Sequence, residues 1–146
     1  MRSKLLDGTG GRSWVLVFET GDEFTERLLA FAREHEVAAA DFTAIGAFEQ
    51  LTLAYFDWER NEYDEHVLAG QVEALALTGN LATEQGEPRV HAHVAVGLPD
   101  TSVRGGHLVR AVVRPTLELF LREAAAGLVK APDEATGLSL IDPEAG

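Results

Sequence analysis

The segment 89–97 alternates between two kinds of side chain, and this alternation restricts its structure more than any other feature of the chain. It reads Arg-Val-His-Ala-His-Val-Ala-Val-Gly, so that His91 and His93 share one parity. The residues of the other parity are all apolar: Val90, Ala92, Val94 and Val96. Because successive side chains of a β-strand point to opposite faces, we predict a strand with a core face and an imidazole face. The two histidines would lie about 6.6 Å apart along the backbone.

A third histidine follows the next turn. After a predicted loop at 98–104, the sequence Gly-Gly-His places His107 near the start of a second predicted strand, 105–113. If the two strands pair antiparallel, His107 lies beside His91 and His93. Three imidazole nitrogens suit Zn²⁺ or another divalent metal and leave one position open, where a bound water becomes acidic. The alternative interpretation is a group of partly exposed histidines that bond to their neighbours.

The net charge of −12 is distributed unevenly along the chain. Nucleic-acid binding draws much of its affinity from Lys and Arg that neutralise phosphates, so autonomous DNA binding is the least expected function. Within 89–122, however, there are five arginines and two acidic residues, so this segment is +3 and the remainder is −15. The arginines either pair with acidic neighbours across the surface or draw an anionic ligand toward the histidines.

Strand parity narrows the set of arginines that can reach the histidines. Arg110 and Arg114 have the parity opposite to that of His107, so a regular strand points them away from the cluster. Arg89 and Arg104 remain as candidate ligand-binding residues. The acidic residues share no compact spacing with the histidines, so the sequence nominates no general base or other catalytic residue. Whether the protein is an enzyme stays open.

The remaining patterns predict one domain of the α+β class. The segment 13–19 is β-branched and aromatic, which is typical of a strand. Thr20 and Glu23 match a capping box, and apolar residues then recur at helical spacing from Phe24 to about Glu36. Further strands are predicted at 39–48, 51–58, 66–68 and 71–81, while 115–123 fits a short helix or a final strand. One strand, one main amphipathic helix and then five or more strands indicate a mostly antiparallel sheet.

Some details bear on how this sheet is covered. Gly46 interrupts strand 39–48 and predicts a bulge or a close approach of the backbone. Both parities of 51–58 are largely apolar, so this strand is expected to be covered on both faces. A single helix covers one face, and the other requires a second helix or another subunit. Residues 1–12 are expected to be a loose lead-in, and the acidic segment after Ala131 offers few apolar residues for packing.

Composition excludes several other classes of protein. Without cysteine, the chain forms neither disulfides nor thiolate metal sites. No apolar run reaches the ~20 residues that span a bilayer, and the N-terminus lacks the apolar core of a signal peptide. We therefore expect a cytoplasmic protein that binds no membrane. The dinucleotide-binding, P-loop and nucleophile-elbow motifs are absent from the sequence.

Several motifs taken together resemble those of the plants-and-prokaryotes conserved domain, known as the PPC domain. They are Gly-Glu-Pro-Arg-Val-His-Ala-His at 86–93, Gly-Gly-His-Leu at 105–108, Leu-Thr-Gly-Asn-Leu at 77–81 and Ala-Ile-Gly-Ala at 44–47. The opening strand and helix fit the same pattern. The resemblance covers about 12–142 of a single domain assigned to 1–146.

The resemblance implies an α+β domain that assembles as a homotrimer, with sheets packed across the subunit interfaces. In prokaryotic members three histidines can hold a metal, often zinc, and the matching positions here are His91, His93 and His107. Asn80, which lies in one of the matching motifs, joins the candidate ligand-binding residues. Plant members carry an AT-hook with an Arg-Gly-Arg core, and this chain contains no such core.

We therefore expect a homotrimeric PPC-type protein with a three-histidine site for a divalent metal. Zinc is the favoured metal, and the site is expected to be open to a small anionic ligand. Its role would be metal-dependent ligand binding, or a hydrolytic or lyase reaction. The alternative is a trimeric module that binds another protein, for example in a transcriptional complex, with the histidines merely structural. Direct binding to A·T-rich DNA ranks last.

Overall fold

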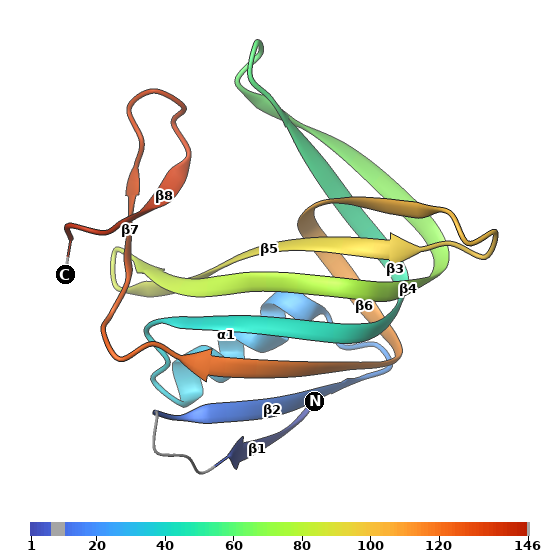
Figure 1. Ribbon diagram of the computed structural model, residues 1–146, viewed down its shortest axis with the longest axis horizontal. Coiled ribbons are helices and arrows are strands. Elements are labelled where there is room, and N and C mark those ends of the chain that lie inside the picture. Colours follow the sequence, from blue (N-terminus) through green and yellow to red (C-terminus); the bar gives the residue numbers. More distant parts are fainter. Residues whose placement is uncertain (7–10, 146) are drawn as a thin grey trace.

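The computed structural model describes residues 1–6 and 11–145. Within them, one helix accompanies a sheet of eight strands (Figure 1). The elements in chain order are β1 (Arg2–Leu6), β2 (Ser13–Glu19), α1 (Phe24–Glu34), β3 (Ala40–Asp57), β4 (Glu62–Glu84), β5 (Glu87–Gly97), β6 (Val103–Glu123), β7 (Val129–Pro132) and β8 (Ser139–Asp142). β7 pairs parallel with β4, and every other pair of these strands is antiparallel. The arrangement agrees with the predicted α+β class and the mostly antiparallel sheet.

Three strands are longer than predicted, because segments expected to be separate are continuous. β3 joins 39–48 to 51–58, β4 joins 66–68 to 71–81, and β6 joins 105–113 to 115–123, which is therefore a strand. The interruptions are shifts of register within the ladders, one of them at Gly46. The φ of Gly46 is +153°, and a Cβ on it would lie 2.3 Å from the Thr116 carbonyl oxygen. The predicted bulge or close approach at Gly46 is confirmed.

The long strands let the sheet curl back on itself. β5 pairs with the end of β4 on one side and with the start of β6 on the other. β6 also pairs with β3 along most of its length, so β3, β4, β5 and β6 form a closed circuit of paired strands. The largest fully buried side chains belong to one hydrophobic core and include Phe18, Phe24, Phe42, Phe48, Leu51, Leu77, Leu117 and Leu119. Full burial of each such side chain contributes about 1.5–3 kcal/mol.

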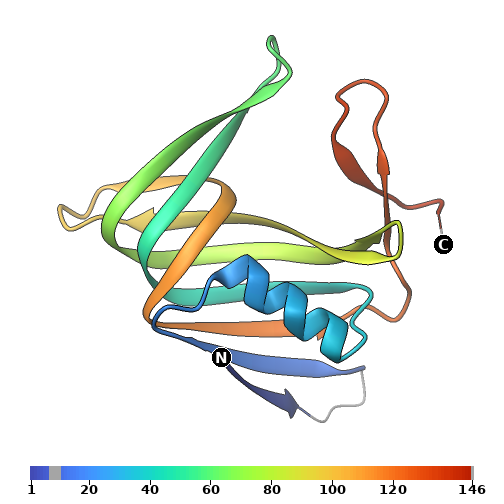
Figure 2. The ribbon, with the colours of Figure 1, turned by 180° about the vertical axis from the view of Figure 1, so that it is seen from behind.

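α1 packs on one face of the sheet (Figure 2). Its buried residues are those of the predicted apolar stripe: Phe24, Leu28, Phe31 and Ala32. The predicted capping box is wrong, because Glu23 itself is the N-cap and accepts a hydrogen bond from the Glu26 amide at 2.8 Å. Thr20 lies in a turn that is hydrogen-bonded to β6. The Thr20 hydroxyl donates to the Pro115 carbonyl, and the Gly21 amide donates to the Val113 carbonyl. These contacts delay the start of the helix to Phe24.

The two ends of the chain are more ordered than predicted. Arg2–Leu6 pairs with β2, where a loose lead-in was expected, and residues 7–10 of that lead-in lie outside the described residues. Near the C-terminus, β7 and β8 form a hairpin that projects from the sheet on the same side as the tip of the β3–β4 hairpin (Figure 1). In the described ranges, no helix is long and apolar enough to cross a membrane.

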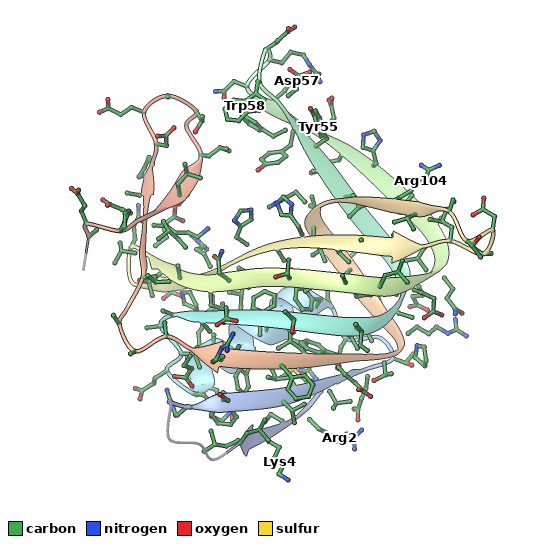
Figure 3. All side chains as sticks on the ribbon, viewed as in Figure 1. Arg2, Lys4, Tyr55, Asp57, Trp58 and Arg104 are labelled. Carbon is green, nitrogen blue, oxygen red and sulfur yellow. The ribbon has the colours of Figure 1, made fainter. Side chains whose placement is uncertain are left out.

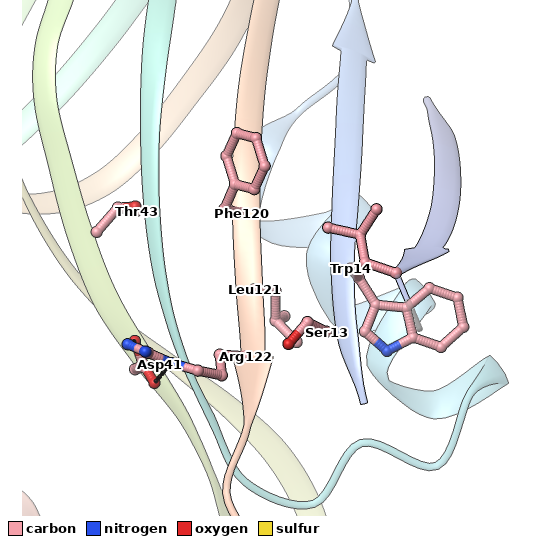
Figure 4. A pocket seen from close by; sticks show the side chains of 8 residues that line it. Ser13, Trp14, Asp41, Thr43, Phe120, Leu121 and Arg122 are labelled. Atoms are coloured by element: carbon pink, nitrogen blue, oxygen red, sulfur yellow. Dashed lines mark hydrogen bonds and ion pairs between the residues drawn. The ribbon is translucent and has the colours of Figure 1, made fainter. Parts of the chain in front are cut away.

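The face of the sheet opposite α1 carries the histidines. Directly paired residues of an antiparallel ladder share a face, and Phe120, Thr43, Thr78, His93 and His107 form one such row across the strands. The adjacent row contains Arg122, Asp41, Asn80 and His91. Figure 4 shows the part of this face around Phe120, a hollow of about 310 Å³ beside the Asp41–Arg122 ion pair.

Candidate metal centre

The three predicted histidines meet on neighbouring strands. His91 and His93 lie on β5, and His93 is the direct cross-strand partner of His107 on β6. One nitrogen from each imidazole lies within 4.8 Å of the other two, and the ring centroids are 5.2–5.4 Å apart. The spatial cluster expected from strand parity is therefore formed.

The geometry of this cluster fits a divalent metal. Tetrahedral bonds of about 2.0–2.1 Å hold neighbouring ligand nitrogens about 3.4 Å apart, so a closure of at most about 1.4 Å between any two nitrogens would suffice. Within the described residues, the buried Nδ1 of His107 has no hydrogen-bond partner. A buried polar atom left in this way costs about 1–3 kcal/mol, which a ligand bound at the cluster can offset. The three histidines could hold a metal with at least one position left open.

Burial keeps His91 and His107 in the form that binds metals. Desolvation, followed by the charges of Lys130, His107 and His93, lowers the pKa of His91 to about 4. The pKa of His107 is lowered as well, first by desolvation and then by His93 and Lys130. A histidine coordinates metal through a neutral ring nitrogen. At neutral pH, His91 and His107 are therefore ready to act as ligands.

Asn80, the third candidate ligand-binding residue, lies beside the cluster. It is the direct cross-strand partner of His91, so the two side chains share the helix-free face. Its Oδ1 is buried and accepts no hydrogen bond from the residues that the structure describes. The amide is therefore positioned to interact with an imidazole or with a molecule bound at the cluster.

The two candidate arginines lie differently. Arg89 shares the face of His91, but its Nε donates to Glu84 Oε2 at 2.8 Å, so its charge is already paired. Arg104 does not reach the cluster: the strand β6 begins one residue before it, and its partner in the ladder is the core residue Val96. Its side chain therefore leaves the opposite face of the strand from His107, and Figure 3 shows it far from the β7–β8 hairpin. The loop predicted at 98–104 is shorter than expected, which explains this difference.

Two other arginines of the segment 89–122 pair with acidic neighbours across the surface, which was the first of the two interpretations of this positive charge. Arg114 pairs with Glu49 at 3.3 Å, and Arg122 pairs with Asp41 at 2.9 Å. Together with Arg89, they show that three of the five arginines of the segment 89–122 are paired with acidic neighbours. The sequence-based excess of +3 therefore overstates the positive potential at the cluster.

Aromatic side chains from the β3–β4 hairpin form one wall of the cluster. The ring of Tyr63 lies 5.1 Å from that of His107 at an interplanar angle of 31°, and Phe56 lies 5.1 Å from Tyr63. The Tyr63 ring displaces water from one side of His107, which agrees with desolvation as the main cause of the lowered pKa of that imidazole. The β3–β4 hairpin thus borders the cluster on the side of His107.

Lys130 is a charged residue near the cluster that no sequence pattern predicted. It lies on β7, has only 9% of its surface exposed, and its charge helps to lower the pKa of both His91 and His107. The sequence gives only a weak indication that Lys130 has a special role. It is one of two lysines in the chain, and its neighbours in the sequence are apolar. Nothing local in the sequence links it to β5, because the link passes through the pairing of β7 with β4.

Comparisons with known proteins agree with this architecture. The family model of the Plants and Prokaryotes Conserved (PCC) domain matches residues 6–125. A plant- and prokaryote-conserved (PPC) protein from Pyrococcus horikoshii is 31% identical, with a TM-score of 0.85 over 97% of this chain and 94% of that chain. A metal-containing protein from Archaeoglobus fulgidus is 32% identical, with a TM-score of 0.84 over 94% of this chain and 98% of that chain.

A third solved structure is similar in fold. It is a candidate DNA-binding protein from Bacteroides thetaiotaomicron, 24% identical, with a TM-score of 0.90 over 98% of this chain and 99% of that chain. The comparison with curated protein sequences finds no match. The family match covers most of the chain and agrees with the fold and the motifs. This chain therefore belongs to the Plants and Prokaryotes Conserved domain family, as its sequence motifs predicted.

Proposed function

We propose that this protein is a homotrimer that binds a divalent metal, zinc by preference, through His91, His93 and His107. The open position of the metal accepts water or a small anionic ligand. The observation that carries the proposal is the approach of the three imidazole nitrogens to within 4.8 Å of one another. When bound, zinc acts as a Lewis acid, which suits ligand binding and also hydrolytic or lyase chemistry.

The donor set supports zinc over hard cations. The cluster offers three nitrogen ligands without a carboxylate among the described residues, whereas Mg²⁺ and Ca²⁺ prefer oxygen ligands. Three histidines with an open fourth position are also the donor set of known zinc sites. The relative from Archaeoglobus fulgidus, 32% identical, is named as a metal-containing protein. We carry this property to the present chain as part of the proposal.

The proposed trimer rests on the helix-free face. Ile45, Leu75 and Phe120 lie on it with 60%, 51% and 58% of their surfaces exposed. Thr43, Leu75 and Phe120 also line a common hollow of about 350 Å³. Large apolar side chains grouped in this way favour burial against another protein surface. Because Phe120 stands in the same cross-strand row as His93 and His107, the metal site would lie near a subunit boundary.

Metal analysis of protein purified without an affinity tag or chelator tests the metal site. We expect about one zinc per chain in the wild type and a large loss in the His91→Ala/His93→Ala double variant. His66→Ala is the matched control, because His66 is exposed on β4 and does not belong to the cluster. Equal metal content in the wild type and the double variant would overturn the proposal.

The alternative function is a trimeric module that binds another protein. Tyr55 and Trp58, near the tip of the β3–β4 hairpin, have 67% and 70% of their surfaces exposed and are available to a partner (Figure 3). In this case the histidine variants would change stability or assembly, and metal-free protein would keep its partner. Direct DNA binding remains the least favoured, because the chain is strongly acidic; it predicts a steep loss of affinity with salt.

A further inference from the structure

Lys130 is an unusual residue even without regard to the histidines. It is the buried charged side chain of the described part of the chain, with 9% of its surface exposed. Burial lowers its pKa, the Glu84 carboxylate acts in the opposite direction, and no hydrogen bond to another described residue contributes. A lysine whose side chain is mostly buried and that has no hydrogen bond or ion pair to a described residue is a candidate for a role in binding.

The backbone holds the segment of Lys130 against β4, the strand that also pairs with the histidine strand β5. Thr83 on β4 donates two hydrogen bonds to the Leu128 carbonyl, from its amide at 2.8 Å and from its hydroxyl at 3.1 Å. Val129 is then the cross-strand partner of Thr83, and Lys130 follows it. Asn80, three residues earlier on β4, is the partner of His91. β4 therefore pairs both with β7, which carries Lys130, and with β5, which carries His91 and His93.

The nearest acidic group does not neutralise Lys130 by direct contact. Glu84 accepts a hydrogen bond from Arg89 through Oε2 and one from the Ser139 hydroxyl through Oε1. Both carboxylate oxygens therefore have other partners. Because side chains alternate along a strand, Lys130 leaves β7 on the face opposite that of Val129, and Asn80 and His91 leave β4 and β5 on the face opposite that of Thr83.

The charges in this region favour an anion. Neutral imidazoles would leave the full double charge on a bound divalent cation, and Lys130 adds a further positive charge on the same side of the sheet. Attraction between opposite charges strengthens where water is partly excluded, as it is beside the buried lysine and the aromatic wall. An ammonium donates hydrogen bonds and accepts none, so its natural partners are oxygen atoms.

We propose that Lys130 is the anion-recognition residue of the histidine site and that its ligand is a small oxyanion, a carboxylate or a phosphate. One oxygen of this ligand would occupy the open metal position while another accepts a hydrogen bond from the Lys130 ammonium. The inference rests on the proposed metal site. Lys130 takes the role first predicted for Arg104 and Arg89. Arg104 leaves β6 on the face opposite to that of His107, and Arg89 already forms an ion pair with Glu84. Lys130 also lies beyond residue 125, where the family match ends.

The chain offers a closely matched experiment because it contains two lysines, Lys4 and Lys130. Lys4 is exposed on β1, away from the cluster. Full-length wild type, Lys130→Met, Lys130→Gln, Lys130→Arg and Lys4→Met would be loaded with Co²⁺, a spectroscopic substitute for zinc. Acetate and inorganic phosphate would then be titrated separately at constant ionic strength and followed by the visible absorption of cobalt. Circular dichroism would verify that each variant is folded.

We expect a saturable spectral change in the wild type with at least one of the two anions, and the tighter of them identifies the ligand class. Lys130→Met and Lys130→Gln should require about tenfold more anion, the effect of one charged hydrogen bond. Lys130→Arg should retain most of the affinity, and Lys4→Met should match the wild type. Failure of the wild type to bind cobalt would overturn the metal site itself. Cobalt binding with no saturable anion response, or with equal affinity in the neutral Lys130 variants, would overturn the role of Lys130 alone.

Discussion

His93 and His107 lie directly opposite each other in the β5–β6 ladder, with ring centroids 5.4 Å apart. They meet because the first part of β6 pairs with β5 as well as with β3. A slip of one residue in this ladder would turn the side chains of one strand to the other face. The register of the curled sheet therefore decides whether the histidine cluster exists.

Gly79 keeps the histidine strand close to β4. A Cβ on Gly79 would lie 2.4 Å from the His91 carbonyl oxygen and 2.5 Å from the Phe42 ring. In Gly79→Ala, β5 must move, so we expect the free energy of unfolding to fall by about 1–3 kcal/mol. Metal affinity should fall with it, because His91 moves. Denaturant unfolding and metal titration measure both effects.

Gly127→Ala is the control for this prediction. A Cβ on Gly127 would meet no atom within 4 Å, and the substitution should leave stability and metal affinity nearly unchanged. Wild-type values for both quantities in Gly79→Ala would show that β5 tolerates the additional methyl group.

The pKa of His91 predicts how the stability of metal-free protein depends on pH. Burial is the main cause that lowers it from 6.5 to about 4. Between these values the unfolded chain binds a proton that the native state does not, so stability is lost as the pH falls through this window. Above about pH 6.5 the contribution is fully present and constant.

Urea unfolding of chelator-treated protein at several pH values measures this effect. His91→Gln removes the titrating group and should flatten the dependence between about pH 4 and 6.5 relative to the wild type. The same slope in both proteins would mean that His91 is not held neutral in the native state.

Phe120 provides a test of the proposed assembly. Its ring is 58% exposed on the helix-free face, and Phe120→Glu would place a charge in the proposed subunit contact. We expect a trimeric wild type and a monomeric or dissociating variant in light scattering coupled to gel filtration, because an unpaired buried charge is strongly unfavourable. Val67→Glu, on the β3–β4 hairpin and at a similarly exposed position of 63%, is the control and should stay trimeric. A monomeric wild type, or a stable Phe120→Glu trimer, would contradict the proposed interface.

Glu23 links the helix to the sheet. Its two carboxylate oxygens accept hydrogen bonds from the amide of Glu26 at 2.8 Å and from that of Ala111 at 3.1 Å. Glu23→Ala should lower the free energy of unfolding by about 1–2 kcal/mol, as for the loss of an N-cap. Thr20→Ala should cost less, because it removes only the exposed contact to Pro115. Thermal unfolding compares them, and a larger effect at Thr20 would favour the capping box predicted from sequence.

Local patterns predicted the parts of the fold that depend on local contacts. Helical spacing identified the buried face of α1, and strict alternation in 89–97 identified both faces of β5. Strand parity also placed His91 and His93 together. These predictions succeeded because the periods of a helix and of a strand fix which side chains share a face.

The remaining features depend on pairing between distant segments. The sequence 98–104 gives no sign that β6 begins at Val103, and this start decides the face from which Arg104 emerges. The pairing of Val129 with Thr83 is what brings the segment of Lys130 to the strand next to the histidine strand. Such contacts are set by the register of the whole sheet, which no short window of sequence contains.

The most direct test of the metal centre is a crystal structure of tag-free protein supplied with zinc, with anomalous scattering recorded at the zinc edge. If the three histidines hold zinc, we expect an anomalous peak about 2.0–2.1 Å from one nitrogen each of His91, His93 and His107, with a further ligand in the open position. Imidazoles that bond only to protein groups or to water, with no anomalous peak among them, would contradict it.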